Sequence, residues 1–436
     1  MVMVSGEAMT QEDRRRFLDE IGGWDGFEVV DLRTEDALEP DVLGMPSGRL
    51  IVMLQPRAGA TKWCSRCGEP VVEIHDTAER RIRDLPIGDR DTYLIVPVAR
   101  LRCPRCGPTT EAIPWVDRYQ RMTTRLAEKI AKLASIAAIK HVAEWFGLSW
   151  DTVKQIDRRA LERRLGPVDL RGIRRIAIDE FALHRGQAYA TLVVDVDTRR
   201  VLWVGRGRAR EHLRPFFTAL GPAGCQALEA VVMDLAPAYV QEVRAQCPHA
   251  AIVADLFHVV ARYGAEVLDR VRVDEMNRVG RAIRQGQPGA YRRIQARRPF
   301  WRARWLLLSN QAHLASADQI RLQDLLEANQ ALFVVYVLKE DLKALWHIRD
   351  FAAAQLAWTG WYQRAIASGI TPLVRFAERL AKSVEYVVNH ARFPLHTSLV
   401  EGINNKIKVL KRVAYGYRDD EYFFLKIRAA FPGIPR

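Results

Sequence analysis

The sequence predicts a multidomain α/β protein, and three observations support that prediction. Two CxxC pairs lie early in the chain, a long stretch of helical spacing follows them, and short apolar runs then alternate with helical segments. A chain of 436 residues has room for about three domains. Its apolar fraction of 49% is enough for well-packed cores. We therefore expect a globular protein built of several separately folded parts.

The charge of the chain favours a polyanionic partner. Lys and Arg number 66 against 52 Asp and Glu, which gives a net charge of +14 and a pI of about 9.7. Nucleic acid is the natural candidate, although a soluble protein can be basic without binding it. No apolar run approaches the roughly 18 residues of a membrane span, and the start of the chain carries EDRRR where a secretory signal needs apolar residues. We expect a cytoplasmic protein with no membrane partner.

Four of the six cysteines form a candidate zinc site. They occur as two CxRCG knuckles, KWCSRCGE and LRCPRCGP, in which the glycine lets the backbone turn its amides toward the sulfurs. Four thiolates give the closed tetrahedral shell of structural zinc, and disulfides are the weaker alternative in a reducing cytoplasm. His75 lies between the knuckles but is not needed as a ligand. Within a strand module over residues 1–113 we expect one Zn²⁺ bound by Cys64, Cys67, Cys103 and Cys106.

Helical spacing then predicts a helix-turn-helix within residues 114–168. In HVAEWFGLSWDTVKQIDRR, Gly147 permits the tight turn, Leu148 packs between the helices, and Ser149 can cap the second helix. An ordinary helical hairpin is the alternative, but the upstream zinc module and the positive charge favour DNA binding. The residues expected at the major groove are Ser149, Trp150, Lys154, Gln155 and Arg158.

From residue 169 the spacing becomes that of an α/β core. Three consecutive apolar strands are followed by a helix, a strand, a helix and a fifth strand, which ends in ADLFHVV. This order is that of a ribonuclease H-like core, whose first part we assign to residues 169–262. Residues 263–392 are too many for an unstructured loop and predict a large helical insertion. Residues 393–436 complete this core with a basic helix.

The insertion is rich in Trp and Arg. Its Trp side chains could stack on unpaired bases at a cleaved DNA end, but aromatic residues at helical spacing more often fill a core. The arginine run over residues 292–304 is the better candidate for contact with DNA, and it can equally be a solvated face. The Trp residues in question are Trp301, Trp305, Trp346, Trp358 and Trp361.

Three acidic residues occupy positions that suit a two-metal site. Asp179 in IRRIAIDEFAL and Asp234 in LEAVVMDLA end apolar strands, and Glu401 opens the basic helix. A carboxylate at the end of a buried strand is held rigidly at a sheet edge, and a third on a packed helix can complete a cage for divalent cations. Neighbouring strand residues face opposite sides, so only one of Asp179 and Glu180 can point at the site, and we expect Asp179.

Some of these acidic positions have a second interpretation. Asp255 ends the fifth strand near the same sheet edge, and we expect it to orient the metal ligands rather than to be one. His258 can hydrogen-bond nearby, although a single His after a strand is more often structural. Glu401 could instead close a capping box with Ser398, because SLVE has the SxxE pattern.

The motifs IDEFA, VVMDLAPAY, ADLFHVV and EGINNKIKVLKRVAYGYRD, with the paired knuckles, resemble the transposases of the ISL-three insertion-sequence family, which are of the DDE class. The resemblance runs from about residue 60 to residue 430. It implies cut-and-paste DNA transposition at the prokaryotic nucleoid, with terminal inverted repeats recognised by the zinc and helix-turn-helix region. Asp179 and Asp234 match the two aspartates of that class and Glu401 its glutamate, which implies two Mg²⁺ ions, or Mn²⁺, at these carboxylates.

The partners follow from the same resemblance. We expect double-stranded DNA, both as transposon ends and as target, and a homodimer on paired ends. A basic stripe beside Glu401 would lie along the DNA strand, formed by Asn405, Lys408, Lys411 and Arg412.

Two other functions fit parts of the sequence. A non-catalytic zinc and helix-turn-helix regulator leaves the acidic residues unexplained, and a structure-selective nuclease rarely needs two modules that read sequence.

Overall fold

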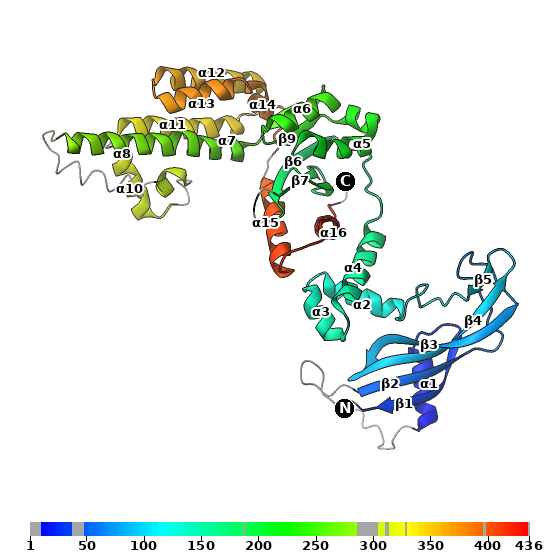
Figure 1. Cartoon of the computed structure of the whole chain (residues 1–436). Helices are drawn as coiled ribbons and strands as arrows, with labels where there is room; N and C mark the ends of the chain where they lie inside the picture. The colour runs from blue at the N-terminus through cyan, green and yellow to red at the C-terminus, as the bar shows by residue number, and fades with distance from the viewer. Residues whose placement is uncertain are drawn as a thin grey trace, which may run out of the picture. The chain divides into compact units, whose positions relative to one another are not determined.

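The computed structural model describes residues 10–36, 48–184, 186, 188–285, 304–309, 314–327, 329–395 and 398–434. The chain divides into two compact units, each described here by itself (Figure 1). The first unit comprises residues 1–166 with residues 411–418, and the second comprises residues 167–410 with residues 419–436.

The first unit opens with a helix, α1 (Gln11–Ile21), and a five-stranded sheet. Alternate residues of the long fourth strand are buried in one core with Leu18 of α1 and Trp24, as expected for a sheet with one covered face. The strands, in pairing order, are β1 (Phe27–Glu35), β2 (Gly48–Pro56), β4 (Arg90–Cys103) and β3 (Ile74–Ile87), with β5 (Gly107–Thr110) on β4.

Three helices follow the sheet, α2 (Thr124–Ala134), α3 (Ile139–Phe146) and α4 (Trp150–Leu165). The predicted helix-turn-helix is confirmed in α3 and α4. Gly147 ends α3 with a φ of 56°, a conformation that favours glycine. Ser149 accepts a hydrogen bond from the Thr152 amide at 3.2 Å and so caps α4.

The second unit is built on another five-stranded sheet of mixed direction. Strand β7 pairs antiparallel with both β6 and β8, whereas β9 pairs parallel with both β6 and β10. The sheet thus confirms the predicted succession of strands. In pairing order the strands are β10 (Ala251–Ala254), β9 (Ala230–Met233), β6 (Arg175–Ala182), β7 (Tyr189–Asp195) and β8 (Val201–Arg206).

Helices pack against this sheet. Buried Phe216 and Tyr239 share one core with Ile176 and Val231 of the sheet. Phe423 packs edge to face on Phe181, with ring centroids 6.2 Å apart. The helices that carry these three aromatic residues are α5 (Arg210–Ala227), α6 (Pro237–Gln246) and α16 (Asp420–Ala430).

The described residues between β10 and α15 (Ser398–Val413) are largely helical, as the sequence predicts for residues 263–392. Its longer helices lie side by side, with α11 next to α8 and α12, and α12 next to α13 (Figure 1). No helix among the described residues is long and apolar enough to cross a membrane. The helices are α7 (Leu256–Tyr263), a π-helical turn (Gly264–Leu268), α8 (Asp269–Arg284), α10 (Ser316–Glu327), α11 (Gln330–Ala344), α12 (Phe351–Ala367), α13 (Thr371–Ala381) and α14 (Val384–Val388).

The tryptophans of the insertion mainly fill its core. Trp346, Trp358 and Trp361 are buried there, so for these three residues packing explains the aromatic spacing. Trp305 is 59% exposed. Trp301 and most of the arginine run, residues 292–303, lie outside the described residues.

Candidate active site

Three aspartates occupy equivalent positions on three neighbouring parallel strands. The strand register aligns Ile178 of β6 with Met233 of β9, and Met233 with Ala254 of β10. The residue that follows each of these is an aspartate. Because aligned residues of parallel strands lie at one level of the sheet, the carboxylates of Asp179, Asp234 and Asp255 emerge at the same edge.

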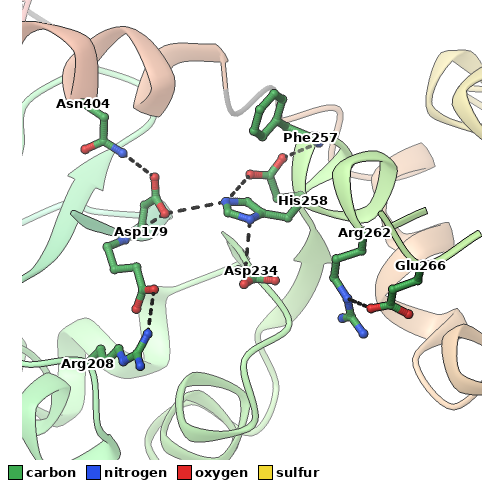
Figure 2. A network of polar contacts seen from close by, with 10 residues as sticks. Asp179, Arg208, Asp234, Phe257, His258, Arg262, Glu266 and Asn404 are labelled. Carbon is green, nitrogen blue, oxygen red and sulfur yellow. Dashed lines mark hydrogen bonds and ion pairs between the residues drawn. The ribbon is translucent and has the colours of Figure 1, made fainter. Parts of the chain in front are cut away.

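His258 lies between the three carboxylates (Figure 2). Its Nε2 atom is 3.8 Å from Asp179 Oδ1 and 3.6 Å from Asp255 Oδ2, and its Nδ1 atom is 3.8 Å from Asp234 Oδ2. Asp255 is held by capping α7, since it accepts a hydrogen bond from the Phe257 amide at 2.8 Å. The imidazole therefore sits where it can position all three acidic groups.

Asp179 is the most enclosed of the three carboxylates expected to bind divalent cations. Its side chain is 17% exposed, and its Oδ2 atom accepts a hydrogen bond from Asn404 Nδ2 at 2.7 Å. Burial raises the pKa of Asp179 to about 6, and the nearby Asp255 carboxylate adds to the rise, while the Glu180 amide, His258 and Asn404 oppose it. A carboxylate with a raised pKa at an accessible cavity suits a cation that would compensate its charge. The Oδ1 atom of Asn404 is itself buried and has no hydrogen-bond partner among the described residues.

Glu401 and Asp179 line one cavity of about 600 Å³. Glu401 is exposed in the first turn of α15, and Asn404, one helical turn further on, lines the same cavity. Hard oxygen donors of this kind suit Mg²⁺ or Mn²⁺. Among the described residues, only the four cysteines bring three or more donor groups within 4.8 Å of one another, so the acidic residues do not form a closed cage. Carboxylates without a cation repel one another.

The structure adds cavity residues that sequence reasoning missed. Asn404 could have been found, because it lies three positions after Glu401 and so on the same helical face. Lys343 comes from the insertion, whose packing the sequence does not reveal; Trp346, one of the tryptophans considered for base stacking, also lines the cavity. Glu180, expected to face away from the site, also lines the cavity and pairs with Arg208 at 3.4 Å.

The four knuckle cysteines form a compact cluster in the first unit. Their sulfurs all lie within 4.8 Å of one another, and the Sγ atoms of Cys67 and Cys103 are 3.7 Å apart. Sulfurs bound to one tetrahedral zinc at 2.3 Å are ~3.8 Å apart, so the cluster fits zinc. Burial alone would raise the pKa of the Cys64 thiol, but hydrogen bonds from the Cys67 and Arg66 amides lower it to about 6 and favour the thiolate.

The expected DNA-binding residues lie on two helices. On α4, Ser149, Trp150 and Gln155 are exposed, whereas Lys154 and Arg158 are half-buried. The Lys154 ammonium lies 5.4 Å from the centre of the Trp150 ring. On α15, Asn405 and Lys408 are exposed in the second unit, and the last turn, with Lys411 and Arg412, belongs to the first unit.

The protein families and the individual proteins that this chain matches are all described as transposases. Residues 176–427 match a family described as transposase, residues 111–161 the helix-turn-helix domain of transposase family ISL3, and residues 60–106 the zinc finger of transposases IS204, IS1001, IS1096 and IS1165. The transposase for insertion sequence element IS1001 of Bordetella parapertussis is 46% identical over 423 residues, 97% of this chain and 99% of the relative.

A second relative is more distant. The transposase for insertion sequence element IS1557 of Mycobacterium tuberculosis is 30% identical over 410 residues, which cover 90% of this chain and 91% of the relative. The zinc-finger match falls on the cysteine cluster and the helix-turn-helix match on α3 and α4. The chain therefore belongs to the ISL3 family of insertion-sequence transposases, with a zinc ribbon and a helix-turn-helix ahead of its transposase domain.

Proposed function

We propose that this transposase binds the terminal inverted repeats of an insertion sequence and catalyses metal-dependent cleavage and transfer of DNA strands. Asp179, Asp234 and Glu401 are the proposed catalytic carboxylates. The single observation that supports the proposal best is the alignment of strand-end aspartates around His258. A packed core has no need to collect like charges at one sheet edge, where they repel one another.

The core is proposed to be ribonuclease H-like. Its support is the strand order β8-β7-β6-β9-β10, in which the first three strands run antiparallel and the last two join in parallel. Residues 169–262 and 393–436 would make up this core, with residues 263–392 inserted between them. Residues 1–113 and 114–168 would be the zinc-binding and helix-turn-helix parts.

The carboxylates of Asp179, Asp234 and Glu401 would hold two Mg²⁺ ions, or Mn²⁺. Bound there, the ions would stabilise the attacking and leaving oxygens of an in-line displacement at a phosphodiester. Asn404 orients the Asp179 carboxylate through its hydrogen bond at 2.7 Å. Asp255 and His258 orient the acidic groups from the other side. Asn405 and Lys408 face the DNA backbone.

The two amino-terminal modules supply recognition. The zinc ribbon and α4 read the inverted repeats, with Trp150, Lys154, Gln155 and Arg158 at the groove, and a homodimer brings two ends together at the nucleoid. A regulator without chemistry would leave the three aligned aspartates and the cavity unexplained. A structure-selective nuclease shares the site but stops at cleavage, so strand transfer separates it from a transposase.

The experiment uses the full chain, DNA with two insertion-sequence ends, and a target plasmid. Asp179→Ala and Asp234→Ala should abolish end cleavage and leave binding to the ends intact, because basic residues elsewhere neutralise the phosphates. The matched control is Glu229→Ala, which removes an exposed carboxylate that lies just before β9 and pairs with Arg174. Loss of binding together with cleavage would give the aspartates a structural role. Cleavage without joining to the target would favour the nuclease.

A further inference from the structure

Phe257 is an exposed aromatic residue beside the sheet edge at which Asp179, Asp234 and Asp255 emerge. Phe257 lies in the first turn of α7 between Asp255 and His258, and it is 58% exposed. The backbone at this position is held, because the Phe257 amide donates a hydrogen bond to Asp255 Oδ1 at 2.8 Å. The ring meets the His258 ring edge to face, with centroids 5.9 Å apart. A large apolar surface is thus presented to solvent from a rigid backbone.

The other aromatic residues described at this cavity are less available. Phe181 is 8% exposed and Trp346 is 3% exposed, so their ring faces are occupied by packing. Tyr189 is half-buried, and the Arg208 guanidinium lies 4.2 Å from its ring centre. Of the four aromatic side chains described in the cavity lining, Phe257 is the most exposed.

The cavity is lined by both apolar and charged side chains. Leu256, Phe257, Val260 and Leu395 are among the apolar ones, and Asp179, Glu401, Asn404 and Lys408 are among the polar ones. Its volume of about 600 Å³ is in the range of small-molecule sites. A nucleotide also combines two such kinds of surface, since its base is a flat aromatic surface and its phosphate is charged.

We propose that Phe257 is the stacking platform for one unpaired base next to the cleaved phosphodiester. The inference rests on the proposed function, because it requires a DNA strand at the carboxylates. A base inside a duplex cannot reach the ring, so the base must leave its stack, and the contact with Phe257 offsets part of that cost. Phe257 is in this sense a positioning residue, which holds the strand so that the neighbouring phosphate meets the acidic groups.

The test measures end cleavage by Phe257→Ala and Phe257→Trp, on intact DNA and on DNA with single abasic sites beside the cleavage point. Phe257→Ala should cleave intact ends about 5- to 150-fold more slowly, the equivalent of about 1 to 3 kcal/mol per stacked base. Phe257→Trp should stay within about threefold of wild type, since it retains an aromatic face. At one abasic position, wild type and Phe257→Ala should cleave at equal rates, because no base remains to stack.

A fluorescence readout complements the rates. 2-Aminopurine at that same position should become brighter when wild type binds the end with Ca²⁺ in place of Mg²⁺, and less so with Phe257→Ala. The control is Phe333→Ala, which removes a 50% exposed aromatic side chain from α11 and should leave both readouts unchanged. Equal melting temperatures of the variants would confirm that they are folded.

The outcomes separate the inference from the proposed function. If wild type cleaves and Phe257→Ala matches it on intact DNA, the inference alone is wrong. If Phe257→Ala is slowed equally at every abasic position, the ring has a packing role and the inference is again wrong. If wild type cleaves no insertion-sequence end, the proposed function fails and the inference fails with it.

Discussion

Burial of the Asp179 carboxylate lowers the free energy of unfolding of the metal-free protein at neutral pH. Its pKa is raised from 3.8 to about 6, so between these values the folded state binds more protons than the unfolded state. The stabilising contribution of the protonated group is complete below about pH 4 and is lost as the pH rises through about 6. At neutral pH the metal-free protein therefore retains a charge that the fold disfavours.

We predict that Asp179→Asn stabilises the metal-free protein at pH 7. Asparagine removes the charge, but its one amide oxygen can replace only one of the two acceptors that Asp179 offers to Asn404 and to the Glu180 amide. Because the lost hydrogen bond offsets part of the gain, unfolding in urea with EDTA should show a net gain of about 1 to 2 kcal/mol. Adding Mg²⁺ should raise the melting temperature of wild type and leave that of Asp179→Asn unchanged. A variant less stable than wild type in EDTA would contradict this account of Asp179.

The same raised pKa predicts a pH limit for catalysis. Protons and divalent cations compete for the Asp179 carboxylate, so cleavage by wild type should decline as the pH falls through about 6. A tenfold higher Mg²⁺ concentration should move the midpoint of the profile to lower pH. A midpoint that ignores the Mg²⁺ concentration would show that proton binding elsewhere limits cleavage.

Glu401 has two interpretations that one substitution separates. The Ser398 side chain needed for a capping box lies outside the described residues, while Glu401 lines the cavity with Asp179. Glu401→Gln can still serve a cap but supplies no charge to a cation. We predict nearly unchanged melting and DNA binding, with cleavage reduced by at least about a hundredfold. Near-normal cleavage would assign Glu401 to the cap and make Asp255 the next candidate ligand.

At the scale of elements, the helical insertion contributes a basic group to the cavity. Lys343, near the end of α11, lines the cavity and pairs with Glu340 at 2.8 Å. On the proposed function, its ammonium would exchange this partner for a phosphate of the DNA backbone. The insertion thus supplies part of the site as well as its own core.

We predict that Lys343→Ala slows end cleavage by about tenfold, the scale of one hydrogen bond to a charged group. Binding of whole ends should change little, because on the proposed function α4 and the zinc ribbon supply most of it. Lys382→Ala removes an exposed lysine just after α13 and serves as the control. Equal effects of the two substitutions would indicate only a loss of net charge.

The elements also show how far the sequence could predict the site. Periodicity predicted the strands, and strand ends pointed to Asp179, Asp234 and Asp255, because register follows from where apolar runs stop. Phe257 and Lys343 gave no such signal. Their roles depend on which face of α7 stays open and how α11 packs, and local spacing contains neither. The rule that neighbouring strand residues face opposite sides was wrong for Glu180, because a long side chain near a strand end can still reach the cavity.

At the scale of the whole molecule, we expect zinc to stabilise the fold of the cysteine-bearing part of the chain, which is proposed to bind DNA. Zinc should not affect the sheet edge that carries Asp179, Asp234 and Asp255. Cys103 ends β4 and lies against Cys67 in the cysteine cluster, so the metal ties the far end of the sheet together. The metal's binding energy is then folding energy for this part of the chain.

We predict that Cys103→Ser loses stoichiometric zinc and loses binding to transposon ends. Hydrogen exchange should increase in residues 60–110 while the sheet of the second unit stays protected. Cys225→Ser is the control, because Cys225 is a buried thiol of the second unit outside the cysteine cluster. Full zinc content in Cys103→Ser would overturn the four-cysteine site.

The hydrogen bond between Asn404 and Asp179 joins residues 225 positions apart. A ribosome that adds roughly 5–20 residues per second needs about 10 to 45 s to make the chain between them. Asp234 is added early in that interval, whereas Glu401 and Asn404 are added only at its end. On the proposed function, cleavage competence would therefore arise only after residue 404 has been made, and a chain abandoned before residue 401 would not cut the DNA that encodes it.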